Sequence, residues 1–124
     1  SPQYGMIQGG LNDNPAKKLK PIAHEITAKT GLSHKDGAVS LARWAPGTAT
    51  SEFFIMVGDQ TYLDADPTAK GDNAGFAVFG QVVEGMEVVK AILASPTSPT
   101  AGGPAMKGQM LLQPVPIRTV RRAG

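Results

Sequence analysis

The sequence of 124 residues contains no cysteine. That absence excludes disulfide bonds, thiolate metal sites and a cysteine nucleophile together. It does not identify the compartment, because a chain without cysteine suits the cytoplasm as well as an oxidising compartment such as a periplasm.

Long apolar runs and a charge bias are also missing. No stretch approaches the length of a membrane span, so we expect no membrane partner. The net charge is only +2, and the basic residues are spread along the chain. Such a spread is typical of a solvated surface and predicts no nucleic-acid interface. The basic residues are Lys17, Lys18, Lys20, Arg118, Arg121 and Arg122.

Common catalytic motifs are absent as well. The two histidines, His24 and His34, lack the spacing of a metal pair, and we interpret them as loop or surface residues. A triad of Ser51, His34 and Asp59 can be proposed, but no G-x-S-x-G elbow supports it. No Walker A loop is present.

One acidic loop invites comparison with a calcium site. Asp64, Asp66 and Asp72 lie close in sequence, but they lack the spacing and the closing glutamate of an EF-hand. A solvated turn is the better interpretation, and we expect no metal and no cofactor.

What the sequence does contain indicates one domain of short strands with many glycine and proline turns. One helix is expected at Met86–Leu93, where the apolar residues recur at helical spacing until Ser95-Pro96 ends the run. This pattern predicts an antiparallel barrel or sandwich with a helix at one end. The other expected elements are strands at Gly5–Gly10 (ending in a Gly-Gly turn), Ala38–Arg43, Ser51–Val57, Phe76–Val83 and Met110–Val120, a helical turn within Gln60–Asp66 and a long loop at Ser95–Gly108.

The strand Ser51–Val57 has two apolar faces. Side chains alternate across a strand, so Phe53, Ile55 and Val57 share one face, which we predict to be core. The other face carries Glu52, Phe54 and Met56. Because an unpaired buried carboxylate is very costly, Glu52 favours a binding groove on that side.

An apolar groove with a few polar edges is therefore the candidate site. Phe79 and Ile55 are instead predicted to be core residues. The predicted groove residues are Met6, Gln8, Phe54, Met56, Tyr62, Leu63 and Phe76.

Four segments of the chain resemble the cyclophilin family of peptidyl-prolyl cis-trans isomerases, in the order that the family has them. The last, from Val78 to Val89, is the most specific. The resemblance covers nearly the whole chain, which is most similar in kind to bacterial members of the family. The segments are Met6-Ile7-Gln8-Gly9-Gly10, Ser51-Glu52-Phe53-Phe54-Ile55, Leu63-Asp64 and Val78-Phe79-Gly80-Gln81-Val82-Val83-Glu84-Gly85-Met86-Glu87-Val88-Val89.

The resemblance implies a closed antiparallel barrel of eight strands, capped by helices, with a surface groove for an X-Pro peptide. By position, it implies that Phe54, Met6 and Leu63 form the proline pocket, and that Gln8 hydrogen-bonds the substrate backbone. Phe76 stands where the family has a histidine or an aromatic residue. The resemblance also implies that the peptide pairs with the backbone of Ala42, Arg43 and Trp44.

Four departures from the family pattern bear on the site. Glu52 replaces a glutamine, Tyr62 replaces a frequent tryptophan, and Gly5 replaces a second pocket phenylalanine. The arginine that the family uses as a donor precedes the first of these segments and is not in this chain; Arg43 does not match its position. We therefore expect a single cyclophilin-like domain at 1–124 that lacks its first strands and first helix.

The leading functional hypothesis is an enzyme, a prolyl isomerase that assists protein folding. X-Pro isomerisation is slow, with a barrier of roughly 18–20 kcal/mol, and needs no covalent step or cofactor. Gln8, Phe54 and Glu52 are the candidate catalytic residues, and we expect a monomer acting on proline-containing polypeptides. The alternative is a non-catalytic module that binds proline peptides. The role of Glu52, the cyclosporin sensitivity and the choice between bacterial periplasm and cytoplasm stay open.

Overall fold

The computed structural model describes residues 4–11, 14 and 16–123. The chain divides into two compact units, Ser1–Leu93 and Ala94–Gly124, which we describe separately. In the described ranges, no helix is both long enough and apolar enough to cross a bilayer.

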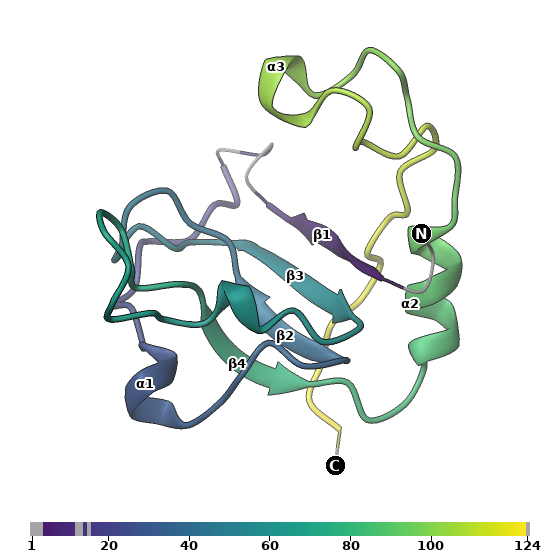
Figure 1. Ribbon diagram of the computed structural model, residues 1–124. Helices are drawn as coiled ribbons and strands as arrows, with labels where there is room; N and C mark the ends of the chain where they lie inside the picture. The colour runs from purple at the N-terminus through teal and green to yellow at the C-terminus, as the bar shows by residue number, and fades with distance from the viewer. Residues whose placement is uncertain (1–3, 12–13, 15, 124) are drawn as a thin grey trace. The chain divides into compact units, whose positions relative to one another are not determined.

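The first unit contains a mixed succession of short strands and helical turns (Figure 1). The expected strands and the helix that ends at Leu93 are all present, and the helical turn around Tyr62 is a 3-10 helix. The elements are β1 (Gly5–Gly10), α1 (Thr27–Thr30), β2 (Ala38–Leu41), β3 (Glu52–Val57), η1 (Thr61–Leu63), β4 (Ala77–Gln81) and α2 (Met86–Leu93).

β1 differs from its expected end in a Gly-Gly turn, because the strand continues through Gly10. Gly10 pairs with Glu52 in the neighbouring strand. A Cβ atom at Gly10 would lie 2.0 Å from the Ser51 carbonyl oxygen, so only glycine allows this close approach. The glycines thus serve strand pairing instead of a turn.

The strands form one antiparallel sheet in the order β1-β3-β2-β4. The described residues therefore build a mainly β fold with few helices, as expected. Their sheet has four strands and is open, whereas the resemblance implies a closed barrel of eight. Closure requires hydrogen bonds between the two edge strands, and β1 and β4 do not pair with each other.

The burial of β3 differs from our prediction at Phe53 to Met56, whereas Val57 is buried as predicted. Phe54 and Met56 are 3% and 0% exposed, so this face is the core and not an open groove wall. Phe53 and Ile55, the predicted core, are only half-buried. The reason is the covering layer: Leu63 and other loop residues pack over the Phe54 side.

The opposite face of the sheet has less cover. α2 contacts β1 and β3, and Val57 beside it is 1% exposed. Phe79, another predicted core residue, is 57% exposed. It lies where the pairing of β2 with β4 is irregular, and no helix packs against β4. The prediction for Phe79 is therefore wrong in this sheet.

The second unit holds the short helix α3 (Gly103–Met106) and one isolated bridge between Thr97 and Leu111. The predicted final strand does not form. Val115 and Ile117 are 52% and 55% exposed, and no described strand pairs with this segment. A strand needs a partner for its backbone groups, and the prolines at 114 and 116 also remove two donors.

Candidate functional site

A pocket of about 360 Å³ opens between the end of β2 and the loop that runs from η1 to β4. Five of the predicted site residues line it together, although they come from distant parts of the chain. They are Arg43, Trp44, Tyr62, Leu63 and Phe76. The remaining lining residues are Asp64, Asp66, Ala69, Asp72, Asn73 and Gly75.

The floor of this pocket joins the buried core. Leu63 and Phe76, which line the pocket, also pack against the cluster that contains Phe54. Met6 and Ala42 pack against the same cluster. The Phe54 and Phe76 rings meet edge to face, with centroids 5.4 Å apart. The predicted proline-pocket residues are thus brought into one apolar assembly.

A close crossing of two loop segments fixes the position of Phe76. Its backbone N–H donates to the Leu63 carbonyl oxygen at 3.0 Å. The preceding Gly75 has φ 63°, and a Cβ atom there would lie 2.5 Å from that oxygen. Further out, the Asp66 N–H donates to the Asn73 carbonyl at 2.9 Å, so the loop is closed at its base. Glycine at 75 therefore permits the crossing that presents Phe76.

Arg43 clamps this loop to β2 and is fully occupied. Its two terminal nitrogens donate to the two Asp72 carboxylate oxygens at 2.8 and 3.1 Å. Its remaining N–H groups donate to the carbonyl oxygens of Gly75 and Trp44. A guanidinium has five N–H donors, so none is left for a substrate.

The same guanidinium also sets the electrostatics at the pocket wall. Its carbon lies 5.0 Å from the centroid of the Phe76 ring, a cation–π contact. Its hydrogen bonds hold the pKa of Asp72 below the ordinary value. Asp72 is therefore bound to Arg43, and this part of the acidic loop is a clamp.

Two aromatic residues form the rim. Trp44 is 86% exposed, and Tyr62 is 72% exposed. The Tyr62 hydroxyl donates to Oε1 of the buried Gln60 at 2.8 Å, and Gln60 in turn donates to the Gly5 carbonyl oxygen. The Tyr62 ring is thus anchored to β1 while its face stays open to solvent.

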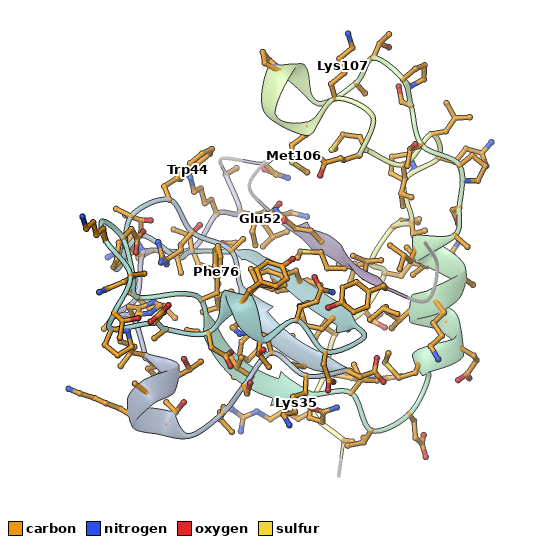
Figure 2. The ribbon with its side chains drawn as sticks, viewed as in Figure 1. Lys35, Trp44, Glu52, Phe76, Met106 and Lys107 are labelled. Atoms are coloured by element: carbon orange, nitrogen blue, oxygen red, sulfur yellow. The ribbon has the colours of Figure 1, made fainter. Side chains whose placement is uncertain are left out.

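The predicted residues of β1 and β3 share the Phe54 side of the sheet. Gln8 pairs with Phe54 in the register, and its side chain is exposed. Glu52 is half-buried, and the Ala42 N–H donates to its carbonyl oxygen. Its Oε2 atom is buried and has no hydrogen-bond partner among the described residues. A buried carboxylate oxygen without a partner is a place where a cationic donor would be stabilised. Figure 2 shows Glu52 and Phe76 labelled over the sheet, with Trp44 further out.

His34 is the residue that the sequence analysis missed. We predicted a loop or surface histidine, yet its side chain is 0% exposed. Its Nδ1 lies 2.6 Å from Asp64 Oδ1, and its Nε2 lies 2.8 Å from Ser40 Oγ. Burial alone would raise the pKa of Asp64, but hydrogen bonds from Ser33 and His34 outweigh it and lower that pKa. Because these partners are 6 and 30 residues from His34 in sequence, no local motif signals them.

The residues of the triad considered earlier have other partners. Ser51 Oγ accepts a hydrogen bond from the Leu19 N–H, and Asp59 Oδ1 accepts one from the Asp36 N–H. The other histidine, His24, is half-buried, with Nε2 3.1 Å from the Ala74 carbonyl oxygen. Within the described ranges, no group of three or more acidic or histidine side chains is arranged to hold a metal ion.

Comparisons with known proteins identify the family of the chain. The family model described as cyclophilin type peptidyl-prolyl cis-trans isomerase matches residues 2–122. A peptidyl-prolyl cis-trans isomerase of Acinetobacter baylyi is 38% identical over 121 residues, which cover 97% of this chain and 60% of that protein. One from Streptomyces antibioticus is 39% identical and covers 96% of this chain and 70% of its own length. Peptidyl-prolyl cis-trans isomerase B of Escherichia coli is 40% identical over 92 residues, covering 70% of this chain and 54% of that protein.

Proposed function

The chain belongs to the cyclophilin-type peptidyl-prolyl cis-trans isomerase family, and we propose that the protein accelerates X-Pro isomerisation in proline-containing polypeptides and so assists their folding. The observation that carries the proposal is the double role of Leu63 and Phe76. Both line the pocket of about 360 Å³, and both pack on the buried cluster that contains Phe54.

The chemistry suits such a pocket. Rotation about an X-Pro bond must overcome roughly 18–20 kcal/mol of lost amide resonance. An apolar wall that holds the proline ring while the carbonyl turns stabilises the twisted state over either planar state. A donor to the prolyl nitrogen would add to that effect, and low polarity around it would strengthen it.

In this proposal Met6, Leu63 and Phe76 hold the proline ring as the resemblance implies, with Tyr62 at the rim. Phe54 is 3% exposed and supports these side chains from beneath. Gln8, exposed beside Phe54, hydrogen-bonds the peptide backbone. The backbone of Ala42, Arg43 and Trp44 pairs with the peptide.

Glu52 would complete the catalytic group. Its Oε2, which has no partner among the described residues, suits an arginine that it would orient toward the substrate. A basic side chain of the substrate is the other candidate partner. Further strands that join the β1 and β4 edges would close the eight-stranded barrel.

A non-catalytic proline-binding module remains the second candidate, and one observation favours it. Arg43 is the only arginine before residue 118, and all of its N–H donors are engaged within the protein. The arginine that lines the pocket therefore has no free donor for a substrate. This module would bind proline peptides without accelerating their isomerisation.

The test is the isomerisation rate of a proline tetrapeptide with the full-length protein and two matched variants. Phe54→Ala should remove most of the activity, whereas Phe53→Ala, on the opposite face of β3, should retain it. Phe54 is 3% exposed, so Phe54→Ala costs about 3–5 kcal/mol of stability and could unfold the protein. Phe76→Ala removes a half-buried ring and serves as a second pocket variant that destabilises the fold less.

The outcomes separate the two functions. Acceleration by the wild type that both pocket variants lose supports the isomerase. Unchanged rates in folded Phe54→Ala and Phe76→Ala would refute the pocket assignment. Binding of the peptide without acceleration by the full-length wild type would establish the binding module instead.

A further inference from the structure

A buried polar chain lies directly under the aromatic wall of the pocket. It runs from Ser40 in β2 through His34 to Asp64 at the end of η1, with ring-nitrogen distances of 2.8 and 2.6 Å. Ser40 and His34 are both 0% exposed. Nothing in the proposed isomerase chemistry uses these three side chains.

The order serine, histidine, aspartate is that of a hydrolase triad, but Ser40 cannot act as a nucleophile. The Ser40 hydroxyl also lies 3.1 Å from the Ala77 carbonyl oxygen, so its one proton is shared between that oxygen and Nε2 of His34. Because the serine is completely buried under the sheet's covering loops, no substrate carbonyl can approach its Oγ. Its role must therefore be sought in what the imidazole contacts.

The imidazole contacts two phenylalanine rings, that of the pocket-lining Phe76 and that of the buried Phe54. Its ring lies nearly parallel to that of Phe54, at 14° with centroids 5.9 Å apart. It meets Phe76 edge to face, at 80° and 6.5 Å. The two phenylalanines are themselves perpendicular, at 87°. The three rings thus form one interlocked cluster.

Within that cluster only His34 has directional bonds. The preferred geometry of an aromatic pair alone contributes only about 0.5–1.5 kcal/mol. The Asp64 carboxylate can only accept, so Nδ1 of His34 carries a proton and donates to it. The backbone N–H of His34 donates to the same oxygen at 2.9 Å, and Ser40 Oγ holds the opposite ring nitrogen. The imidazole plane is therefore fixed from both ends.

We propose that His34 is a positioning residue of the proline pocket: held by Asp64 and Ser40, its ring sets how Phe76, which lines the pocket, packs on the buried Phe54. This inference rests on the proposed function. It means that a buried histidine determines the shape of the site. It also explains why Asp64, a pocket-lining residue, points inward to the histidine.

The experiment compares three variants of the full-length protein. His34→Asn keeps a donor near the position of Nδ1 but removes the ring face against Phe54. Ser40→Ala removes the partner of Nε2, together with the hydrogen bond to the Ala77 carbonyl oxygen, and keeps the ring. Thr27→Val is the matched control, because Thr27 is 5% exposed and its hydroxyl accepts from the Ala65 N–H without touching the rings.

Kinetics with a proline tetrapeptide distinguish positioning from simple structural damage. A misplaced pocket wall weakens binding of substrate and transition state alike, which raises KM and leaves kcat unchanged. A fold defect lowers the active fraction, which lowers apparent kcat at constant KM. We expect His34→Asn to raise KM at least threefold while kcat stays within twofold of the wild-type value. Ser40→Ala should raise KM by a smaller factor, and Thr27→Val should leave KM unchanged. An unchanged KM in folded His34→Asn would overturn the proposal.

A second measurement does not depend on catalysis. In the free protein, nuclear Overhauser contacts between the Phe54 and Phe76 rings report their packing directly. We expect them to weaken in His34→Asn and to persist in Thr27→Val. If the wild type neither binds nor isomerises proline peptides, the proposed function fails, and these contacts alone decide the positioning role. Unaltered contacts in His34→Asn would then refute it.

Discussion

Replacement of Asp64 by alanine should destabilise the fold strongly, because this carboxylate accepts three hydrogen bonds. Two of the donors, the backbone N–H and Nδ1 of His34, belong to a residue that is 0% exposed. The third is the Ser33 hydroxyl, which is half-buried and can turn toward water. Each buried donor left without an acceptor costs about 1–3 kcal/mol, so we expect a loss of about 2–6 kcal/mol in the free energy of unfolding.

Asp66 provides the matched control on the same loop. Its carboxylate accepts from the hydroxyl of Thr68 and from the backbone of Thr68 and Ala69, and it is exposed. Removal of these exposed bonds should cost less than about 1 kcal/mol. The comparison thus holds the residue type, the charge change and the loop constant.

The assay is urea unfolding of the full-length protein, followed by circular dichroism at pH 7. With a slope of about 1–3 kcal/mol per molar urea, Asp64→Ala should lower the midpoint by about 1–3 M, and Asp66→Ala by much less. Equal midpoints for the two variants, with unchanged slopes, would show that the buried donors of His34 do not depend on Asp64.

Three further outcomes follow from the same loop. The pKa values of Asp64 and Asp72 are lowered in the folded state, so their stabilisation is present above about pH 4 and is lost as the pH falls further; a urea midpoint at pH 3 equal to that at pH 6 would contradict this. Gly75→Ala should destabilise by about 1–3 kcal/mol more than Gly71→Ala, since both glycines have positive φ but only the first would overlap a backbone oxygen; circular dichroism melting tests the difference. Arg43→Lys should raise KM for a proline peptide roughly fivefold, because lysine lacks the planar fork and loses about 1 kcal/mol of cation–π contact. An unchanged KM would show that the Arg43 clamp does not contribute to substrate binding.

The regular elements of the first unit could be predicted from local pattern. α2 begins and ends where the apolar spacing and the following Ser95-Pro96 indicated, and β3 follows the alternation around Phe54. These signals are local because a helix or strand face repeats within a few residues. Leu63 and Phe76 were predicted as groove residues from the sequence, and the resemblance then related both to the proline pocket.

The predictions that were wrong concern burial and strand pairing, which depend on contacts between residues far apart in the sequence. Phe53 and Phe54 are equally apolar, so sequence cannot say which face the loops cover. Val115 and Ile117 alternate like a strand, but no described strand pairs with them. The partners of His34 are distant in sequence, so its burial could not be anticipated. In each case the missing information is which segment packs against which.

The closure of the loop at its base has a practical consequence. Because Leu63 and Phe76 are tied to each other, and Asp66 to Asn73, the exposed tip can change length while both anchors stay in place. Doubling a flexible loop costs only about 0.6 kcal/mol. Lys70 and Gly71 are exposed and do not line the pocket, so a short reporter peptide inserted between them would sit next to the binding site without rebuilding its walls. The fold thus offers an attachment point for a sensor of proline-peptide binding.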